Sequence, residues 1–327
     1  MVGAVLSLCV SASSHANNGI ISLLTSPGES EIAHCLAVSN TSPYDPRRIP
    51  NPLRVNQIPL AITPSEGTFN MGYFIGGVDG LDDDNGDGEP DVTGLATWVA
   101  YKAPERADLK DVNPPAAPDQ LYEHWGINRL LSYERPFTIK LREVYDRNPS
   151  YRPISLVPQK HIAAFDREQS CNVYFAFLQA PSNSEWQRYL WNTSNRFIES
   201  LGNQDSDVYV ISGPVFDKTI NYIEGDGLEK IAIPEGVFRV IVKLQHGTAS
   251  VLSLYFPNNK GVNSRRPLTQ EHCGKDFQGI LSHYIVKLEA IEKRSGLSFR
   301  SNFVKDNKQF TEDPKAFFIG REKGGCF

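Results

Sequence analysis

One segment with helical spacing stands among runs of residues that are typical of β-strands. The segment extends from Ser184 to Leu201, and Gly202 follows it as a stop. Its periodic apolar residues are Trp186, Leu190, Phe197, Ile198 and Leu201. The strand-like runs lie at 97–102, at 155–164 before a turn, and at 207–212, 237–244 and 250–256. Strands on both sides of one central helix favour the α+β class over a parallel βαβ sheet.

The composition supports a folded core and restricts the mode of ligand binding. Among 327 residues, 40% are apolar and 10% aromatic, which excludes an intrinsically disordered chain. The net charge of -5 argues against a protein that holds nucleic acid by bulk charge. A basic cleft that binds nucleic acid briefly is still compatible with this charge.

The first sixteen residues have the pattern of a secretion signal. Val2 to Ala12 is apolar and small, and Ser14-His15-Ala16 offers small residues where a signal peptidase cleaves. A frayed terminal helix or strand is the alternative. No later segment has the 18 or so unbroken apolar residues of a membrane span. We therefore expect a secreted or periplasmic protein with a signal peptide (1–16), a loop-rich N-terminal extension (17–92) and one folded domain (93–327).

The cysteine count fits an oxidising compartment. Cys9 lies in the predicted signal, and four cysteines remain: Cys35, Cys171, Cys273 and Cys326. An even number in an exported chain predicts two disulfides, for which the count alone allows three pairings. The sequence has no Cys-x-x-Cys or Cys/His spacing that would indicate zinc.

An acidic loop between residues 82 and 91 is a candidate calcium site. Asp83, Asn85 and Asp87 place oxygen ligands at every second residue, as at the start of an EF-hand loop. The twelfth position is Gly94, so Asp91 would have to replace the usual bidentate glutamate. The prediction is a structural Ca²⁺ site, and the alternative is a solvated acidic turn.

Four segments resemble, in the same order, parts of the secreted DNA/RNA non-specific endonucleases. They are ATWVAYK at 96–102, DVYVISGPVF at 207–216, IPEGVFRVI at 233–241 and EAIEKRSGL at 289–297. The resemblance implies a central antiparallel sheet with a ββα-metal finger and flanking helices. In that family a histidine activates water, and a helix asparagine holds one divalent ion such as Mg²⁺ while DNA or RNA is cleaved.

The resemblance assigns the histidine to His161. The family's Asp-Arg-Gly before this histidine is replaced here by Pro158, Gln159 and Lys160. His161 is thus the candidate general base, and a structural histidine is the alternative. Candidate phosphate contacts that would replace the lost arginine are Lys160, Arg129 and Arg135. We expect His161 at the edge of a strand or turn, facing one cleft with the metal ligand.

The helix positions follow from Trp191, which matches the family's helix tryptophan. The metal-binding asparagine then falls on Gln187, or on Asn183 after a local shift. The glutamate that orders the metal's water falls on Asn195, and an arginine one turn later falls on Glu199. Asn195 supplies no negative charge, and Glu199 reverses the charge expected beside a phosphate.

Two functions stay open at this point. The first is an exported, divalent-metal-dependent endonuclease or phosphodiesterase with altered metal and phosphate contacts. The second is a catalytically inactive protein that keeps the nuclease scaffold for binding. The resemblance also implies the disulfide pairing Cys273–Cys326, which leaves Cys35–Cys171.

Overall fold

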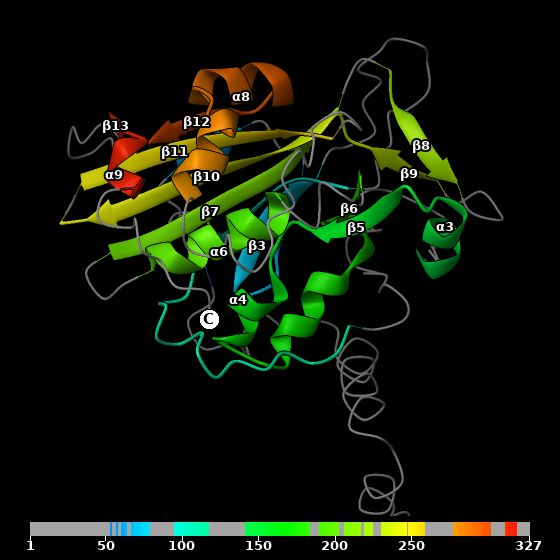
Figure 1. Ribbon diagram of the computed structural model, residues 1–327, viewed down its shortest axis with the longest axis horizontal. Coiled ribbons are helices and arrows are strands. Elements are labelled where there is room, and N and C mark those ends of the chain that lie inside the picture. The colour runs from blue at the N-terminus through cyan, green and yellow to red at the C-terminus, as the bar shows by residue number, and fades with distance from the viewer. Residues whose placement is uncertain are drawn as a thin grey trace, which may run out of the picture.

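The computed structural model describes residues 53, 57, 60–63, 67–78, 95–117, 141–183, 190–202, 206–216, 219–224, 230–246, 248–258, 277–301 and 311–318. In these residues, helices and strands mix around a seven-stranded sheet of order β13-β11-β10-β7-β4-β3-β2 (Figure 1). Its strands are β2 (Gly67–Asn70), β3 (Phe74–Val78), β4 (Ala96–Lys102), β7 (Ser206–Val215), β10 (Gly236–Gln245), β11 (Thr248–Pro257) and β13 (Thr311–Glu312). Neighbours pair antiparallel except β11 and β13, so the expected antiparallel sheet is confirmed in its main part.

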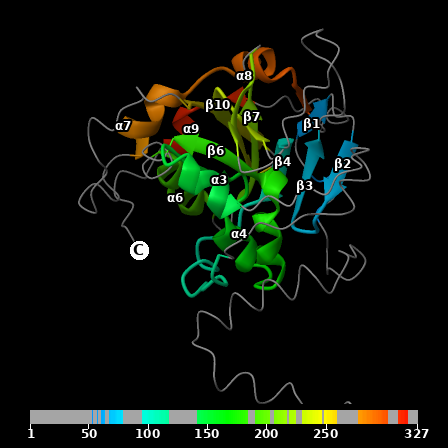
Figure 2. The ribbon, with the colours of Figure 1, turned by 90° about the vertical axis from the view of Figure 1, so that its right-hand side faces the viewer.

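The long central strands are apolar on both faces because both faces are covered. Along β10, Val237 and Ile241 face one layer, whereas Phe238 and Val240 face the other. One face packs against α8 (Leu288–Ser295) and the short pair β1 (Leu60–Thr63) and β12 (Ser298–Ser301). Figure 1 shows α8 on one side of the sheet and α4 and α6 on the other. Figure 2 shows β2 and β3 at one edge.

The remaining described elements surround this framework. The helices are α3 (Leu141–Arg147), α4 (Gln159–Ala163), α6 (Asn192–Leu201), α7 (Phe277–Leu281) and α9 (Lys315–Phe318). The 3₁₀ turns are η4 (Gln169–Tyr174), η5 (Ala176–Leu178) and η8 (Ser282–Tyr284), and β8 (Asn221–Glu224) pairs with β9 (Lys230–Ile233). Gly296, at φ 70°, ends α8 with the left-handed residue that helix ends favour. Within the described ranges, no helix is long and apolar enough to cross a bilayer.

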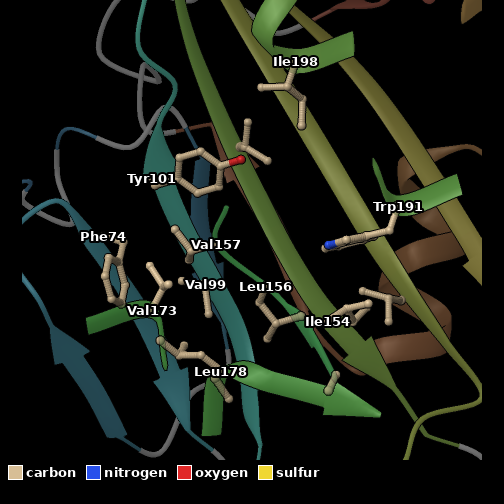
Figure 3. Close-up of a cluster of buried hydrophobic side chains, with 14 of the residues drawn as sticks. Phe74, Val99, Tyr101, Ile154, Leu156, Val157, Val173, Leu178, Trp191 and Ile198 are labelled. Atoms are coloured by element: carbon tan, nitrogen blue, oxygen red, sulfur yellow. The ribbon is translucent and has the colours of Figure 1, made fainter. Parts of the chain in front are cut away.

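A strand pair followed by a helix forms a ββα unit against the sheet. Strands β5 (Tyr151–Ser155) and β6 (Gln179–Asn183) pair antiparallel, and α6 comes next among the described elements. Asn258 ties β6 to the sheet layer, because its Oδ1 accepts from the Asn183 N–H at 2.7 Å and its Nδ2 donates to Pro181 and Pro234 carbonyls. The core between this unit and the sheet is shown in Figure 3.

The structure changes the bounds of one predicted strand and describes only part of one predicted helix. The strand predicted at 155–164 ends at Ser155, and α4 follows because Pro158, with φ -64°, is the N-cap residue that begins this helix. The predicted helix is found from Asn192 to Leu201, and its earlier part at 184–189 lies outside the described residues.

Candidate functional site

The sequence-predicted site residues divide into described and undescribed sets. The described ones are Lys160, His161, Asn183, Asn195, Glu199 and Cys171. Those outside the described residues are Gln187, Arg129, Arg135, Asp83, Asn85, Asp87, Asp91, Cys35, Cys273 and Cys326. Cys171 is buried and disulfide-bonded, with its partner outside the described residues. The predicted pairings and the calcium loop therefore stay predictions.

His161 lies inside the protein, between a strand and a helix. Its side chain is 0% exposed on α4, so the expected position at a strand or turn edge is wrong. Its Nδ1 lies 3.2 Å from the Tyr101 hydroxyl of β4, and its Nε2 lies 3.5 Å from Glu199 Oε1 of α6. The carboxylate favours the tautomer with a proton on Nε2, which leaves Nδ1 to accept from Tyr101.

Burial determines the protonation of this group. It lowers the pKa of His161 below the ordinary value, and the Glu199 charge opposes this shift while Arg239 and Lys160 reinforce it. The Nε2–Oε1 separation of 3.5 Å exceeds a normal hydrogen bond, so Glu199 acts mainly through its charge. His161 is therefore neutral at pH 7.

Glu199 keeps its charge despite being largely buried. Burial alone would raise the pKa of Glu199, but His161, Lys160 and Arg196 together hold it below the ordinary value. The Lys160 ammonium lies 3.8 Å from Glu199 Oε2, with 40% of the lysine side chain exposed. Lys160 and His161 are thus both brought to Glu199, which the sequence resemblance matched to the family's arginine position.

Sequence reasoning missed a buried cation on the same face of the sheet. Arg239 of β10 is 0% exposed, and its Nη2 donates to Asn195 Oδ1 at 2.6 Å. Its Nη1 donates to Ser194 Oγ, and its Cζ lies 3.5 Å from the centroid of the Trp191 ring. Burial lowers the pKa of Arg239 to about 10, which leaves it charged at pH 7. A charged residue between apolar neighbours, inside a strand whose other charge, Lys243, lies nearer its end, was the signal available in the sequence.

The described residues do not fit a divalent metal as they are arranged. They contain no group of three or more His, Cys, Asp and Glu side chains that could hold an ion. Asn195 already gives its Oδ1 to a guanidinium, and a cation of like charge beside that group is repelled. Asn183 is buried in β6, and its backbone N–H donates to Asn258 Oδ1.

Comparisons with known proteins agree on one family. The sequence profile of the DNA/RNA non-specific endonucleases matches residues 179–306, which begin at β6 and so leave out His161. The chain is 28% identical over 153 residues to the mitochondrial nuclease EXOG of Xenopus laevis, covering 43% of this chain and 38% of that protein. It is 26% identical over 132 residues to mitochondrial endonuclease G of Bos taurus, covering 38% and 40%.

A fungal relative and a solved structure extend the comparison. Nuclease C1 of Cunninghamella echinulata var. echinulata is 27% identical over 124 residues, covering 35% of this chain and 42% of that protein. The matches thus span between 38% and 42% of these relatives' lengths. The structure of an EndoG/EndoGI complex superimposes with a TM-score of 0.52 at 17% identity, covering 76% of this chain and 92% of that chain. The profile match and these relatives show that this chain is similar to the DNA/RNA non-specific endonucleases, and the solved structure shows a shared fold.

Proposed function

We propose that this chain is a nuclease-fold protein that binds nucleic acid without hydrolysing it at the family's histidine position. The observation that carries the proposal is the complete burial of His161 between Tyr101 and Glu199. A general base must reach the water whose proton it removes, directly or through one more water. In this arrangement His161 serves the packing of α4 against α6.

The charges around His161 support the same proposal. A phosphodiester gains negative charge in the transition state of hydrolysis. An enzyme therefore places cations or hydrogen-bond donors beside it. Glu199 instead places a carboxylate beside His161, and the same carboxylate forms an ion pair with Lys160. Asn195 has no charge to offer a metal, and its oxygen is bound by Arg239. Nucleic acid is proposed as the ligand because the family acts on it.

A second candidate is the exported, metal-dependent endonuclease. It is favoured by the ββα unit, which keeps the order of strands and helix around a retained histidine. In this function Gln187 or Asn183 would hold Mg²⁺, and Lys160 with Arg129 or Arg135 would contact phosphate. The helices α4 and α6 would have to separate so that His161 meets water. Export is supported by the N-terminal sequence pattern and by the disulfide-bonded Cys171.

The test combines hydrolysis and binding. Plasmid DNA and a structured RNA are incubated with wild type, His161→Ala and the control His283→Ala, which changes an exposed histidine. Mg²⁺, Mn²⁺ and Ca²⁺ are each used. We expect equal cleavage, at background, for all three proteins, and retention of a labelled oligonucleotide measured by fluorescence anisotropy. Cleavage that requires metal and disappears only in His161→Ala would establish the enzyme instead.

A further inference from the structure

Arg239 is a charged side chain in a place where charge is costly. It comes from the middle of β10, between β7 and β11, and it is fully buried. Within the described part of the chain no carboxylate forms an ion pair with it, and its Nε has no hydrogen-bond partner. A buried charge of this kind persists only if neutral groups around it hold it strongly.

Those neutral groups all come from the beginning of α6. Ser194 and Asn195 follow Trp191, the N-cap residue of α6, by three and four positions. All three therefore lie on one side of the helix start. The alternation along β10 directs Arg239 to this face, since Val237 and Ile241 lie in the same layer. The guanidinium therefore meets a ring face, a hydroxyl oxygen and an amide oxygen.

We propose that Arg239 is the resident cation of α6, and that it occupies the Ser194 and Asn195 oxygens so that no divalent ion binds at them. A guanidinium satisfies an amide and a hydroxyl oxygen directly, and its planar face also stacks on the indole. A divalent ion needs several oxygen ligands, usually including carboxylates, and like charge nearby repels it. The inference deepens the proposed function and rests on it for its meaning, because the two helix oxygens that Arg239 occupies are then closed to a metal.

The first arm of the test measures metal binding without any activity. Melting temperatures of the full chain are recorded in Mn²⁺ and in EDTA for wild type and Asn195→Ala. We expect either no Mn²⁺ response or one that is equal in both proteins, since a response from another part of the chain does not involve α6. A Mn²⁺ response of wild type that Asn195→Ala loses would overturn the proposal.

The second arm examines the unpaired charge. Asn195→Asp places a carboxylate beside the guanidinium and should raise the melting temperature in EDTA by about 2–4 °C. The control is Asn192→Asp, an exposed residue one turn earlier on α6, which reports the general benefit of an acidic residue near a helix start. The rise must be larger for Asn195→Asp, and an equal or smaller rise would refute the resident cation.

The two proposals can fail separately. If hydrolysis depends on His161 and the Mn²⁺ effect on the melting temperature does not depend on Asn195, the proposed function is refuted. The proposal that Arg239 is the resident cation then still holds. If the Mn²⁺ effect on the melting temperature depends on Asn195 and no hydrolysis occurs, the proposal about Arg239 is refuted. The proposed function then still holds.

Discussion

Replacing Glu199 with arginine distinguishes a closed site from an open one. In an active relative of this fold, a cation at this position would help to bind phosphate, so Glu199→Arg would create or increase cleavage. In the structure described here, Glu199 instead lies between His161 and Lys160. The substitution places a positive charge beside Lys160 and removes the acceptor that faces a buried imidazole N–H. We therefore expect a loss of stability and no gain of cleavage.

The size of the loss follows from three contributions. The pair with Lys160 is partly exposed, with 25% of Glu199 and 40% of Lys160 accessible, so its removal costs about 0.2–1 kcal/mol. The buried Nε2–H, 3.5 Å from Oε1, loses the attraction of a carboxylate, which costs about 1 kcal/mol. Two cations near 4 Å in a well-solvated setting add about 1 kcal/mol of repulsion. The free energy of unfolding should fall by about 2–3 kcal/mol in total.

The assay is equilibrium unfolding in urea, followed by tryptophan fluorescence, for wild type, Glu199→Arg and the control Glu199→Gln. The glutamine keeps an oxygen for the Nε2–H and removes only the charge, so it should lose about 1 kcal/mol. Its midpoint should lie between those of the other two proteins. If Glu199→Arg is as stable as wild type and cleaves plasmid DNA, then Glu199 faces an open cleft and the closed arrangement is refuted.

Three further predictions concern pH, calcium and disulfides. Because the folded-state pKa of His161 lies below its ordinary value of 6.5, the unfolded chain binds a proton first as pH falls. The free energy of unfolding should therefore decrease from about pH 7 to pH 5. In His161→Gln this dependence on pH should be weaker. An equal dependence in both proteins would contradict the buried, neutral His161. Glu199 adds its own loss at more acidic pH, as pH falls from the ordinary pKa of 4.5 through its depressed folded-state pKa. The loop from Asp83 to Asp91 should bind calcium, so a melting temperature equal in Ca²⁺ and chelator would count against it. Peptide mapping without reduction should recover Cys35 linked to Cys171, and any other partner for Cys171 would show that the predicted pairing is wrong.

The sequence was sufficient for the parts of the fold that have local patterns. The long strands β4, β7, β10 and β11 were predicted because they are buried on both faces and read as continuous apolar runs. Pro158 shows the limit of that reading. The segment 155–164 was predicted to be a strand that runs into a turn, whereas Pro158 is the N-cap residue of α4.

The candidate site depended on contacts that no local pattern reveals. The sequence identified His161 and the reversed charge at Glu199, but it could not show that they meet, or that Tyr101, 60 positions before His161, completes the contact. These partners come together only when α4 and α6 pack on the sheet. Arg239 was visible as a charge among apolar neighbours in β10, yet its partners at the start of α6 follow from the strand alternation and the helix position together.

The protonation of His161 in solution tests the closed site most directly. Its side-chain ¹⁵N resonances can be assigned by their loss in His161→Gln and then followed with pH, with and without Mg²⁺ and an oligonucleotide. We predict a neutral ring with the proton on Nε2, an inflection below 6.5, and no change when metal or oligonucleotide is added. An inflection at or above 6.5 that shifts with Mg²⁺ and nucleic acid would mean that His161 is a solvent-accessible base in a working nuclease site.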